Sequence, residues 1–268
     1  MAIVGFIGAG KMGGAILSSF LEKGLVERKN VLVCEANAER AAAARERFGV
    51  NVTTAPEVIA SACDVIFLAV KPQDWDDVVE RLAPDLRASQ LIVSIAAGKK
   101  LALLRELAGP KPRLARVMPN LPVLVGEGMV AYTLAEPARP ADRKLVAKLL
   151  ESCGHAVELE EKLFDAVTAL SGSGPAFFAY VMRQMALAGE KLGLPPEAAA
   201  LLSNQTMLGT AAYLAGTKQD PEAFIKAVCS PKGTTEAGMR ELSASDVSEI
   251  LGKTLDAAAR RSAELSNM

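Results

Sequence analysis

The sequence has few of the residues that build metal centres and nucleic-acid surfaces. Its 268 residues include a single histidine, His155, and no two of the four cysteines form a CxxC pair, so a metal site is not expected. Aromatic residues make up only 4%, which leaves little material for stacking nucleobases. The 30 Lys and Arg residues and 31 Asp and Glu residues give a net charge of −1, which argues against a nucleic-acid partner.

Long hydrophobic runs are also lacking. The longest apolar stretches, such as residues 65–70, are far shorter than the roughly 20 residues needed to span a bilayer, so no membrane partner is expected. Residues 1–8 lack the basic start and the cleavage site of a signal peptide. With the cysteines interpreted as four buried, reduced thiols, these features predict a soluble protein of the cytoplasm.

The composition is otherwise that of a globular protein, with 50% hydrophobic and 23% charged residues. Residues 1–160 alternate short apolar runs with amphipathic stretches. The expected strands cover residues 2–8, 30–35, 64–70, 90–95, 113–118, 129–133 and 155–159, and the expected helices cover residues 11–23, 38–48, 74–86, 100–107 and 140–153. The strands are nearly continuous apolar runs, which predicts burial on both faces, as in a parallel sheet between helices.

From residue 161 onward only helices are expected. They cover residues 162–170, 175–192, 195–215, 221–228, 234–242 and 247–265. The expected helices 175–192 and 195–215 are apolar on most sides, so their surfaces need to be covered by a partner subunit. The sequence therefore predicts an α/β fold, with an N-terminal Rossmann-type, mostly parallel sheet in residues 1–160 and a C-terminal all-helical dimerisation domain in residues 161–268.

A Gly-rich turn directly follows the first expected strand and opens the first expected helix. Residues 8–13 read GAGKMG, a GxGxxG pattern in the context of a dinucleotide-binding site. Gly8 permits the tight turn, Gly10 lets a pyrophosphate approach the backbone, and Gly13 lets helix and strand pack closely. Lys11 and Met12 complete the turn, and the phosphates are expected at the N–H groups of the helix start.

Glu35 ends the second expected strand. An acidic side chain at this place can bind the adenosine ribose hydroxyls of NAD and repel the 2′-phosphate of NADP. Glu35 can equally face water or pair with Arg40. The choice between NAD and NADP therefore stays open on these grounds.

The loops that end the later strands are expected to line the cofactor. Ligands of a doubly wound sheet lie outside the carboxyl ends of its strands, and small residues there allow close approach. The loop residues are Ala69, Val70, Lys71 and Pro72, then Ala96, Ala97 and Gly98, and finally Asn120. Lys71 can instead be an ordinary solvated lysine.

Residues 229–236, CSPKGTTE, lie between two expected helices. Helix capping at Thr234 or its neighbour, with an acid in the first turn, accounts for the composition. Alternatively, the N–H groups of Gly233, Thr234 and Thr235 hold a substrate carboxylate, and a threonine hydroxyl donates a hydrogen bond to a reacting heteroatom. Residues 171–175, SGSGP, predict a closely packed helix start or a wall near the nicotinamide.

Together these motifs make the sequence similar to the pyrroline-5-carboxylate reductases over essentially its whole length. The segments that carry the resemblance are FIGAGKMG at residues 6–13, FLAVKP at 67–72, SIAAG at 94–98, RVMPN at 116–120, DAVTALSGSGPA at 165–176 and VCSPKGTTEAG at 228–238. The last two together are specific, whereas GxGxxG alone is not.

The resemblance implies hydride transfer from NADPH, or from NADH, to the cyclic imine L-1-pyrroline-5-carboxylate, which gives L-proline in the last step of its biosynthesis. It implies a homodimer through the helical domain, further assembly into a decamer, and an active site shared between one subunit's nucleotide domain and the partner's helices. It places the catalytic hydroxyl on Thr235 and the substrate carboxylate on the backbone of Ser230, Gly233, Thr234 and Thr235. A protonated imine accepts hydride readily, so orientation can supply much of the acceleration without a metal.

Three residues depart from the family's pattern. Lys232 stands where glycine is common, which costs about 1 kcal/mol if that position needs a positive φ. Glu35 replaces a small polar residue, and Pro56 replaces an asparagine that contacts the adenosine side of the cofactor. These two residues leave the preference between NADPH and NADH open.

Other classes fit less well. The β-hydroxyacid dehydrogenases carry a catalytic lysine on the helix after a Gly-rich segment, and here no lysine occurs in that helix before Lys191. A cofactor sensor without catalysis would not need the SPKGTT segment. A purely structural oligomer leaves the Gly-rich turn unexplained. A reductase of a six-membered cyclic imine is not distinguished by sequence.

Overall fold

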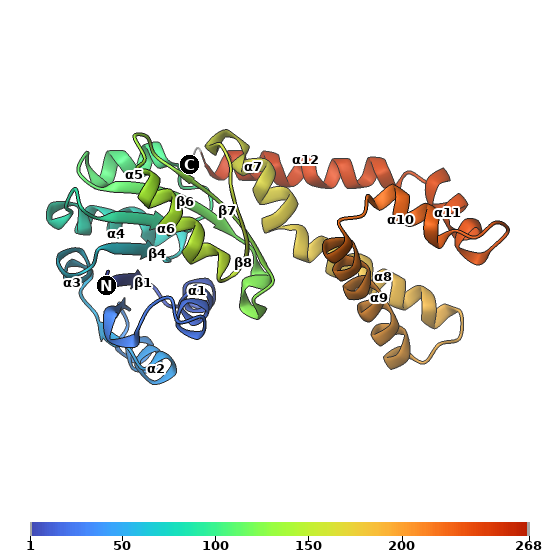
Figure 1. Cartoon of the computed structure of the whole chain (residues 1–268), viewed down its shortest axis with the longest axis horizontal. Coiled ribbons are helices and arrows are strands. Elements are labelled where there is room, and N and C mark those ends of the chain that lie inside the picture. Colours follow the sequence, from blue (N-terminus) through green and yellow to red (C-terminus); the bar gives the residue numbers. More distant parts are fainter. Residues whose placement is uncertain (1, 267–268) are drawn as a thin grey trace. The chain divides into compact units, whose positions relative to one another are not determined.

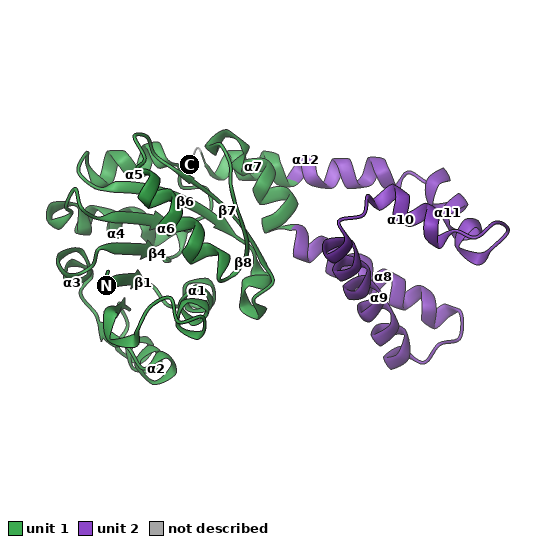
Figure 2. Ribbon diagram, in the orientation of Figure 1, with its two compact units in different colours: residues 1–173, 258–268 green, residues 174–257 purple. Residues whose placement is uncertain are grey.

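The computed structural model describes residues 2–266, which divide into two compact units (Figure 2). The first unit contains the residues up to Ser173 together with those from Ala258 onward, and the second contains Gly174–Ala257. This division does not coincide with the expected domains 1–160 and 161–268, because residues 161–173 and the end of the last helix belong to the first unit. The ends of those expected domains, residues 1, 267 and 268, lie outside the described residues.

The first unit is built on an eight-stranded sheet, counted over the described residues (Figure 1). The strands are β1 (Val4–Ile7), β2 (Val31–Cys34), β3 (Asn51–Thr53), β4 (Val65–Leu68), β5 (Leu91–Ser94), β6 (Arg113–Pro119), β7 (Gly128–Leu134) and β8 (Gly154–Glu158). Their order is β3-β2-β1-β4-β5-β6-β7-β8, and all neighbours are parallel except β6 and β7. The expected mostly parallel sheet is therefore confirmed.

Helices cover both faces of this sheet. They are α1 (Lys11–Glu22), α2 (Ala38–Phe48), α3 (Pro56–Ala62), α4 (Pro72–Leu82), α5 (Leu101–Ala108) and α6 (Pro140–Glu151). Along β1, Phe6 belongs to a hydrophobic cluster that includes residues of α1, α2 and α6, whereas its neighbour Ile7 belongs to a second cluster that includes residues of α3, α4 and α5. Both faces of the central strands are thus buried, which explains why these strands are continuous apolar runs.

Two elements of the first unit were not expected from the sequence. The edge strand β3 has only three residues, and the helix α3 has seven. Elements this short do not complete an alternating or helical pattern, so periodicity cannot reveal them. Pro56 is the buried first residue of α3, and its hydrocarbon ring has no group that could hydrogen-bond to a cofactor.

The second unit is helical. Its helices are α8 (Gly174–Lys191), α9 (Pro196–Thr217), α10 (Pro221–Val228) and α11 (Thr234–Ala244), followed by the start of α12 (Val247–Leu265). Large apolar side chains stay exposed on it, among them Leu192 at 87%, Leu201 at 68% and Met185 at 64% of their full area. Such a surface is typical of a partner interface. Among the described helices, none combines the length and the apolar character that a membrane span requires.

A short irregular stretch joins the last strand to α8. The helix α7 (Phe164–Val167) passes into a five-residue π-helix, η5 (Thr168–Gly172). π-Helical turns are rare and occur frequently at functional sites. This turn carries the first two residues of the SGSGP motif.

Candidate active site

The Gly-rich turn has the geometry expected of a dinucleotide site. Gly8 adopts a φ of +89°, and a Cβ there would lie 2.7 Å from the Ala69 carbonyl oxygen. A Cβ on Gly13 would lie 2.4 Å from the Gly8 oxygen and 2.7 Å from the Ala69 Cβ. A Cβ on Gly10, in contrast, would meet nothing within 4 Å. Gly8 and Gly13 therefore serve close packing, whereas Gly10 leaves open space above the backbone.

The N-terminus of α1 borders this open space and carries the positive partial charge of the helix dipole. Gly10 is the N-cap of α1, and within the described chain neither a side-chain cap nor an acidic first-turn residue neutralises the helix end. The free N–H groups and the helix dipole at such an end favour a phosphate. Lys11 and Met12 form the first turn, so the structure places both beside this space. The residues present fit a dinucleotide pyrophosphate.

The Glu35 side chain turns toward the Gly-rich turn. The side chain is almost fully buried, with 9% of the residue exposed. Its Oε1 accepts a hydrogen bond of 2.5 Å from the Ala9 N–H. The alternatives of a water-facing carboxylate or an ion pair with Arg40 are therefore not what the structure shows. Glu35 is held at the same turn that Gly10 opens.

The later strand ends meet the Gly-rich turn where the strand order reverses. β1 lies between β2 and β4, the switch point at which ligands of such sheets bind. Ala69 packs on Gly8 and Gly13, Lys71 is the exposed N-cap of α4, and Pro72 opens that helix. Val70 and the loop of Ala96, Ala97 and Gly98 follow the neighbouring strands β4 and β5 at the same edge.

Asn120 has a different environment from the one its motif predicts. Its Oδ1 accepts a hydrogen bond of 2.9 Å from the Met129 N–H. Its Nδ2 lies 3.3 Å from both the carbonyl oxygen and the Oγ of Ser171. The amide therefore joins the end of β6 to β7 and to the π-helix. A contact of Asn120 with the cofactor remains a prediction.

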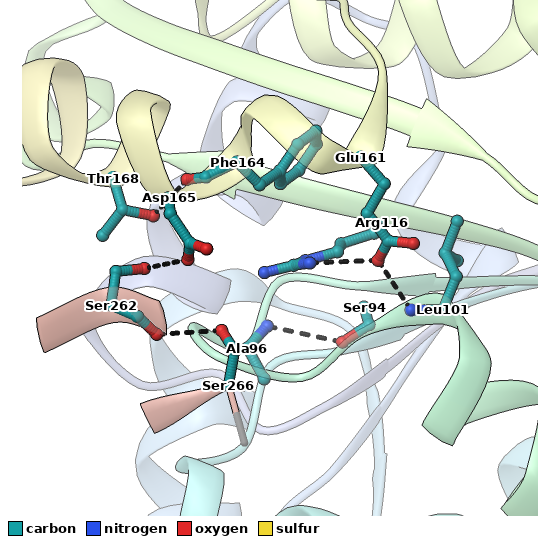
Figure 3. Close-up of polar contacts among 10 residues, drawn as sticks. All are labelled: Ser94, Ala96, Leu101, Arg116, Glu161, Phe164, Asp165, Thr168, Ser262 and Ser266. Carbon is teal, nitrogen blue, oxygen red and sulfur yellow. Dashed lines mark hydrogen bonds and ion pairs between the residues drawn. The ribbon is translucent and has the colours of Figure 1, made fainter. Parts of the chain in front are cut away.

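Figure 3 shows polar contacts that the sequence did not single out. Arg116 is nearly buried, and its Cζ lies 4.8 Å from the centroid of the Phe164 ring. Its Nη1 donates a hydrogen bond of 3.0 Å to Glu161 Oε1. The same oxygen accepts the Leu101 N–H at 2.7 Å. Motif RVMPN contains this arginine, but nothing near it in sequence reveals its partner.

The end of α12 packs against the loop of residues 96–98, one of the loops expected to line the cofactor. Ser262 Oγ donates a hydrogen bond of 2.6 Å to Asp165 Oδ1 (Figure 3). A Cβ on Gly98, which has a φ of +78°, would lie 3.1 Å from the Leu265 carbonyl oxygen. The end of the chain's last helix thus supports the loop of residues 96–98.

The SPKGTT segment forms a tight turn before α11. The Gly233 N–H donates a hydrogen bond of 2.9 Å to the Ser230 carbonyl oxygen, and the Lys232 N–H donates one of 2.7 Å to Glu236 Oε2. The turn itself therefore uses the Gly233 N–H, and the binding of a substrate carboxylate by the backbone of this segment remains a prediction. The N–H groups of Thr234 and Thr235 have no acceptor within the part of the chain that the structure describes.

This turn presents the hydroxyl groups of the segment to ligands. Ser230 and Thr234 are exposed, and Thr235 is half-buried. A Cβ on Gly233 would lie 2.3 Å from Ser230 Oγ and 2.9 Å from the Ser230 carbonyl oxygen, so a side chain at position 233 would force the turn to shift. The free helix start therefore offers two N–H groups and up to three hydroxyls to an anion.

Lys232 adopts a φ of +59°, which confirms the strain anticipated for a lysine at this position. Replacing Lys232 with glycine is expected to raise the free energy of unfolding by about 1 kcal/mol, because glycine adopts this conformation without a Cβ clash. Urea denaturation measures the difference. Lys218→Gly is the matched control, since Lys218 has a φ of 55° at the end of α9. A destabilised Lys232→Gly protein would contradict the strain argument.

Three of the four cysteines are buried, and Cys229 is half-buried, which corrects the expectation of four buried thiols. Burial raises the pKa of Cys34 to about 11, with a smaller contribution from the Glu35 carboxylate, and that of Cys63 to about 12. It also raises the pKa of Cys153. At about pH 8 these thiols are almost fully protonated, and protonated thiols react poorly with disulfide reagents.

Thiol titration of a Cys229→Ala variant with an aromatic disulfide checks this prediction. We expect no fast reaction of the native protein and reaction of all three remaining thiols after unfolding. Fast labelling of any of them in the native protein would contradict the burial and the raised pKa values.

These features define a Rossmann-type dinucleotide-dependent oxidoreductase. A model of the family "Pyrroline-5-carboxylate reductase dimerisation" matches residues 161–265, and one of "NADP oxidoreductase coenzyme F420-dependent" matches residues 3–98. The chain is 39% identical to a pyrroline-5-carboxylate reductase of Arabidopsis thaliana, over 98% of this chain and 95% of that protein. It is 37% identical to one of Pseudomonas aeruginosa, over 98% of this chain and 96% of that protein.

Solved structures similar to this chain include members of the same family. A pyrroline-5-carboxylate reductase from Coxiella burnetii has a TM-score of 0.94 at 31% identity, and it covers 99% of this chain and 98% of that one. A Plasmodium falciparum pyrroline carboxylate reductase with NADP bound has a TM-score of 0.86 at 29% identity, with the same coverage. The chain belongs to the pyrroline-5-carboxylate reductase family. It is an NAD(P)-dependent oxidoreductase whose helical region carries the family's dimerisation domain.

Proposed function

We propose that this chain reduces L-1-pyrroline-5-carboxylate to L-proline as the last step of proline biosynthesis. The observation that carries the proposal is the turn before α11, where free N–H groups and the Thr235 hydroxyl stand together at one helix start. The same chain holds the open Gly10 turn that suits a dinucleotide. A carboxylate-binding group and a cofactor-binding turn are what reduction of an anionic imine requires.

The residues of the turn have distinct roles in this reaction. The N–H groups of Thr234 and Thr235, with Ser230, bind the substrate carboxylate, and Gly233 keeps the turn tight enough to present them. The Thr235 hydroxyl donates a hydrogen bond to the ring nitrogen, which gains an electron pair as the C=N bond is reduced. Bound NAD(P)H supplies the hydride. The protein's contribution is binding and orientation, because a protonated cyclic imine is already a good acceptor.

The active enzyme is a homodimer through the helical region, and we propose further assembly into a decamer. The exposed apolar side chains of the second unit support association through that region. The cytoplasmic location predicted from the sequence remains a prediction.

Steady-state oxidation of NADPH and NADH with racemic pyrroline-5-carboxylate tests this function. A six-membered cyclic imine and, in the oxidative direction, a 3-hydroxy acid serve as comparisons. We expect fast oxidation with the five-membered imine and none with the hydroxy acid. A folded sample that binds the cofactor but shows no imine-dependent oxidation would contradict the proposal.

A further inference from the structure

We propose that this chain binds NADH more tightly than NADPH, and that Glu35 with the start of α2 sets this preference. The inference rests on the proposed function only in that the Gly-rich turn must hold a nicotinamide dinucleotide. It concerns the end of β2, where the adenosine ribose of a dinucleotide lies in Rossmann folds.

The first observation is the fixed position of the Glu35 carboxylate. Its Oε1 is held 2.5 Å from the Ala9 nitrogen, inside the Gly-rich turn, and the residue is only 9% exposed. Its Oε2 makes no bond to another described residue, so one acceptor remains for ribose hydroxyls. Moving this carboxylate aside for a 2′-phosphate would break its hydrogen bond to Ala9, and in its present position the two like charges repel each other.

The second observation concerns α2, whose N-terminus would otherwise attract a phosphate. The Asn37 side chain accepts hydrogen bonds from the Glu39 N–H at 2.9 Å and from the Arg40 N–H at 3.1 Å. Those two N–H groups are therefore already used. Glu39 adds a further negative charge in the first turn of α2. The helix start is thus a poor phosphate site, in contrast to the uncapped start of α1.

Arg40 is the residue of this segment that would favour binding of a 2′-phosphate. It is the one cation among residues 35–40, its side chain is exposed, and arginine at this place can accommodate a 2′-phosphate. Against it stand two carboxylates in the same segment, of which Glu35 is fixed at the turn. An exposed arginine recovers little of the repulsion, because interactions of exposed charges are weak.

Calorimetric titration of the purified oligomer with NADH and with NADPH tests the proposal without any imine. For the wild type we expect the Kd of NADPH to exceed that of NADH by about tenfold or more. In Glu35→Gln, which keeps the acceptor for the Ala9 N–H, the ratio should fall by about tenfold, mainly through tighter NADPH binding. Glu39→Gln is the matched control with the same change of charge, and its effect should be much smaller.

Three outcomes would overturn the proposal. They are equal or tighter binding of NADPH by the wild type, an unchanged ratio in Glu35→Gln, and equal effects of the two glutamine variants. An Arg40→Ala variant that selectively loses tight NADPH binding would assign this subsite to Arg40 instead. Because imine reduction is assayed separately, an active reductase with equal affinities contradicts only this inference. Failure to bind either dinucleotide would contradict the proposed function as well.

Discussion

Replacing Thr235 with alanine is expected to lower turnover of the imine by about a hundredfold while the Kd of the cofactor stays nearly unchanged. The Thr235 side chain stands at the free start of α11, outside the Gly-rich turn that suits the dinucleotide. The substitution removes a hydrogen bond to the reacting nitrogen and leaves the backbone N–H groups in place. The measurements are kcat with saturating imine and calorimetric titration of the cofactor.

Two variants control for indirect effects. Thr235→Ser keeps the hydroxyl and should restore most of the turnover. Thr234→Ala removes the neighbouring hydroxyl at the same helix start and should raise KM more than it lowers kcat. Unchanged turnover in Thr235→Ala would contradict the role that we assign to this hydroxyl.

Gly10 and Gly13 are expected to respond in opposite ways to the same added methyl group. In Gly10→Ala the methyl enters open space, so the free energy of unfolding should change by no more than about 0.5 kcal/mol. The methyl would occupy the place that we assign to the pyrophosphate, so the Kd of the cofactor should rise by about tenfold or more. Urea denaturation and calorimetric titration give the two quantities.

In Gly13→Ala the methyl would lie 2.4 Å from the Gly8 carbonyl oxygen, which is backbone and cannot rotate away. We expect a loss of stability of about 1–3 kcal/mol from this overpacking. Gly10→Ala thus serves as the matched control for Gly13→Ala. Normal cofactor binding by Gly10→Ala would contradict the position assigned to the pyrophosphate.

Most of the fold follows from the pattern of apolar residues. The helix α2 was predicted with its observed bounds, and β1 and β4 fall inside the expected strands because their runs must be apolar on both faces. The pattern cannot reveal β3 and α3, because three and seven residues are fewer than the stretch over which a strand or helix period can be recognised. It also cannot give the antiparallel pairing of β6 with β7, because that pairing depends on the path of the short segment that connects the two strands.

The candidate site was less predictable than the fold. The glycines of the first turn act through local backbone geometry, so their roles could be inferred from spacing. The side chains of Glu35 and Arg116 depend on partners 26 and 45 positions away in the chain, which no local motif encodes. Gly233 shows the same limit at short range, since its N–H is used by a turn whose exact form the sequence did not reveal.

The proposed reaction is a direct transfer of hydride from the reduced cofactor to the carbon of the C=N bond. The most direct measurement is a reaction with reduced nicotinamide cofactor deuterated at its transferable position, followed by mass spectrometry and NMR of the product. We expect L-proline with one deuterium per molecule, located on the ring carbon that belonged to the imine. Proline without deuterium at that carbon, or no proline at all from an oligomer that binds the cofactor, would contradict it.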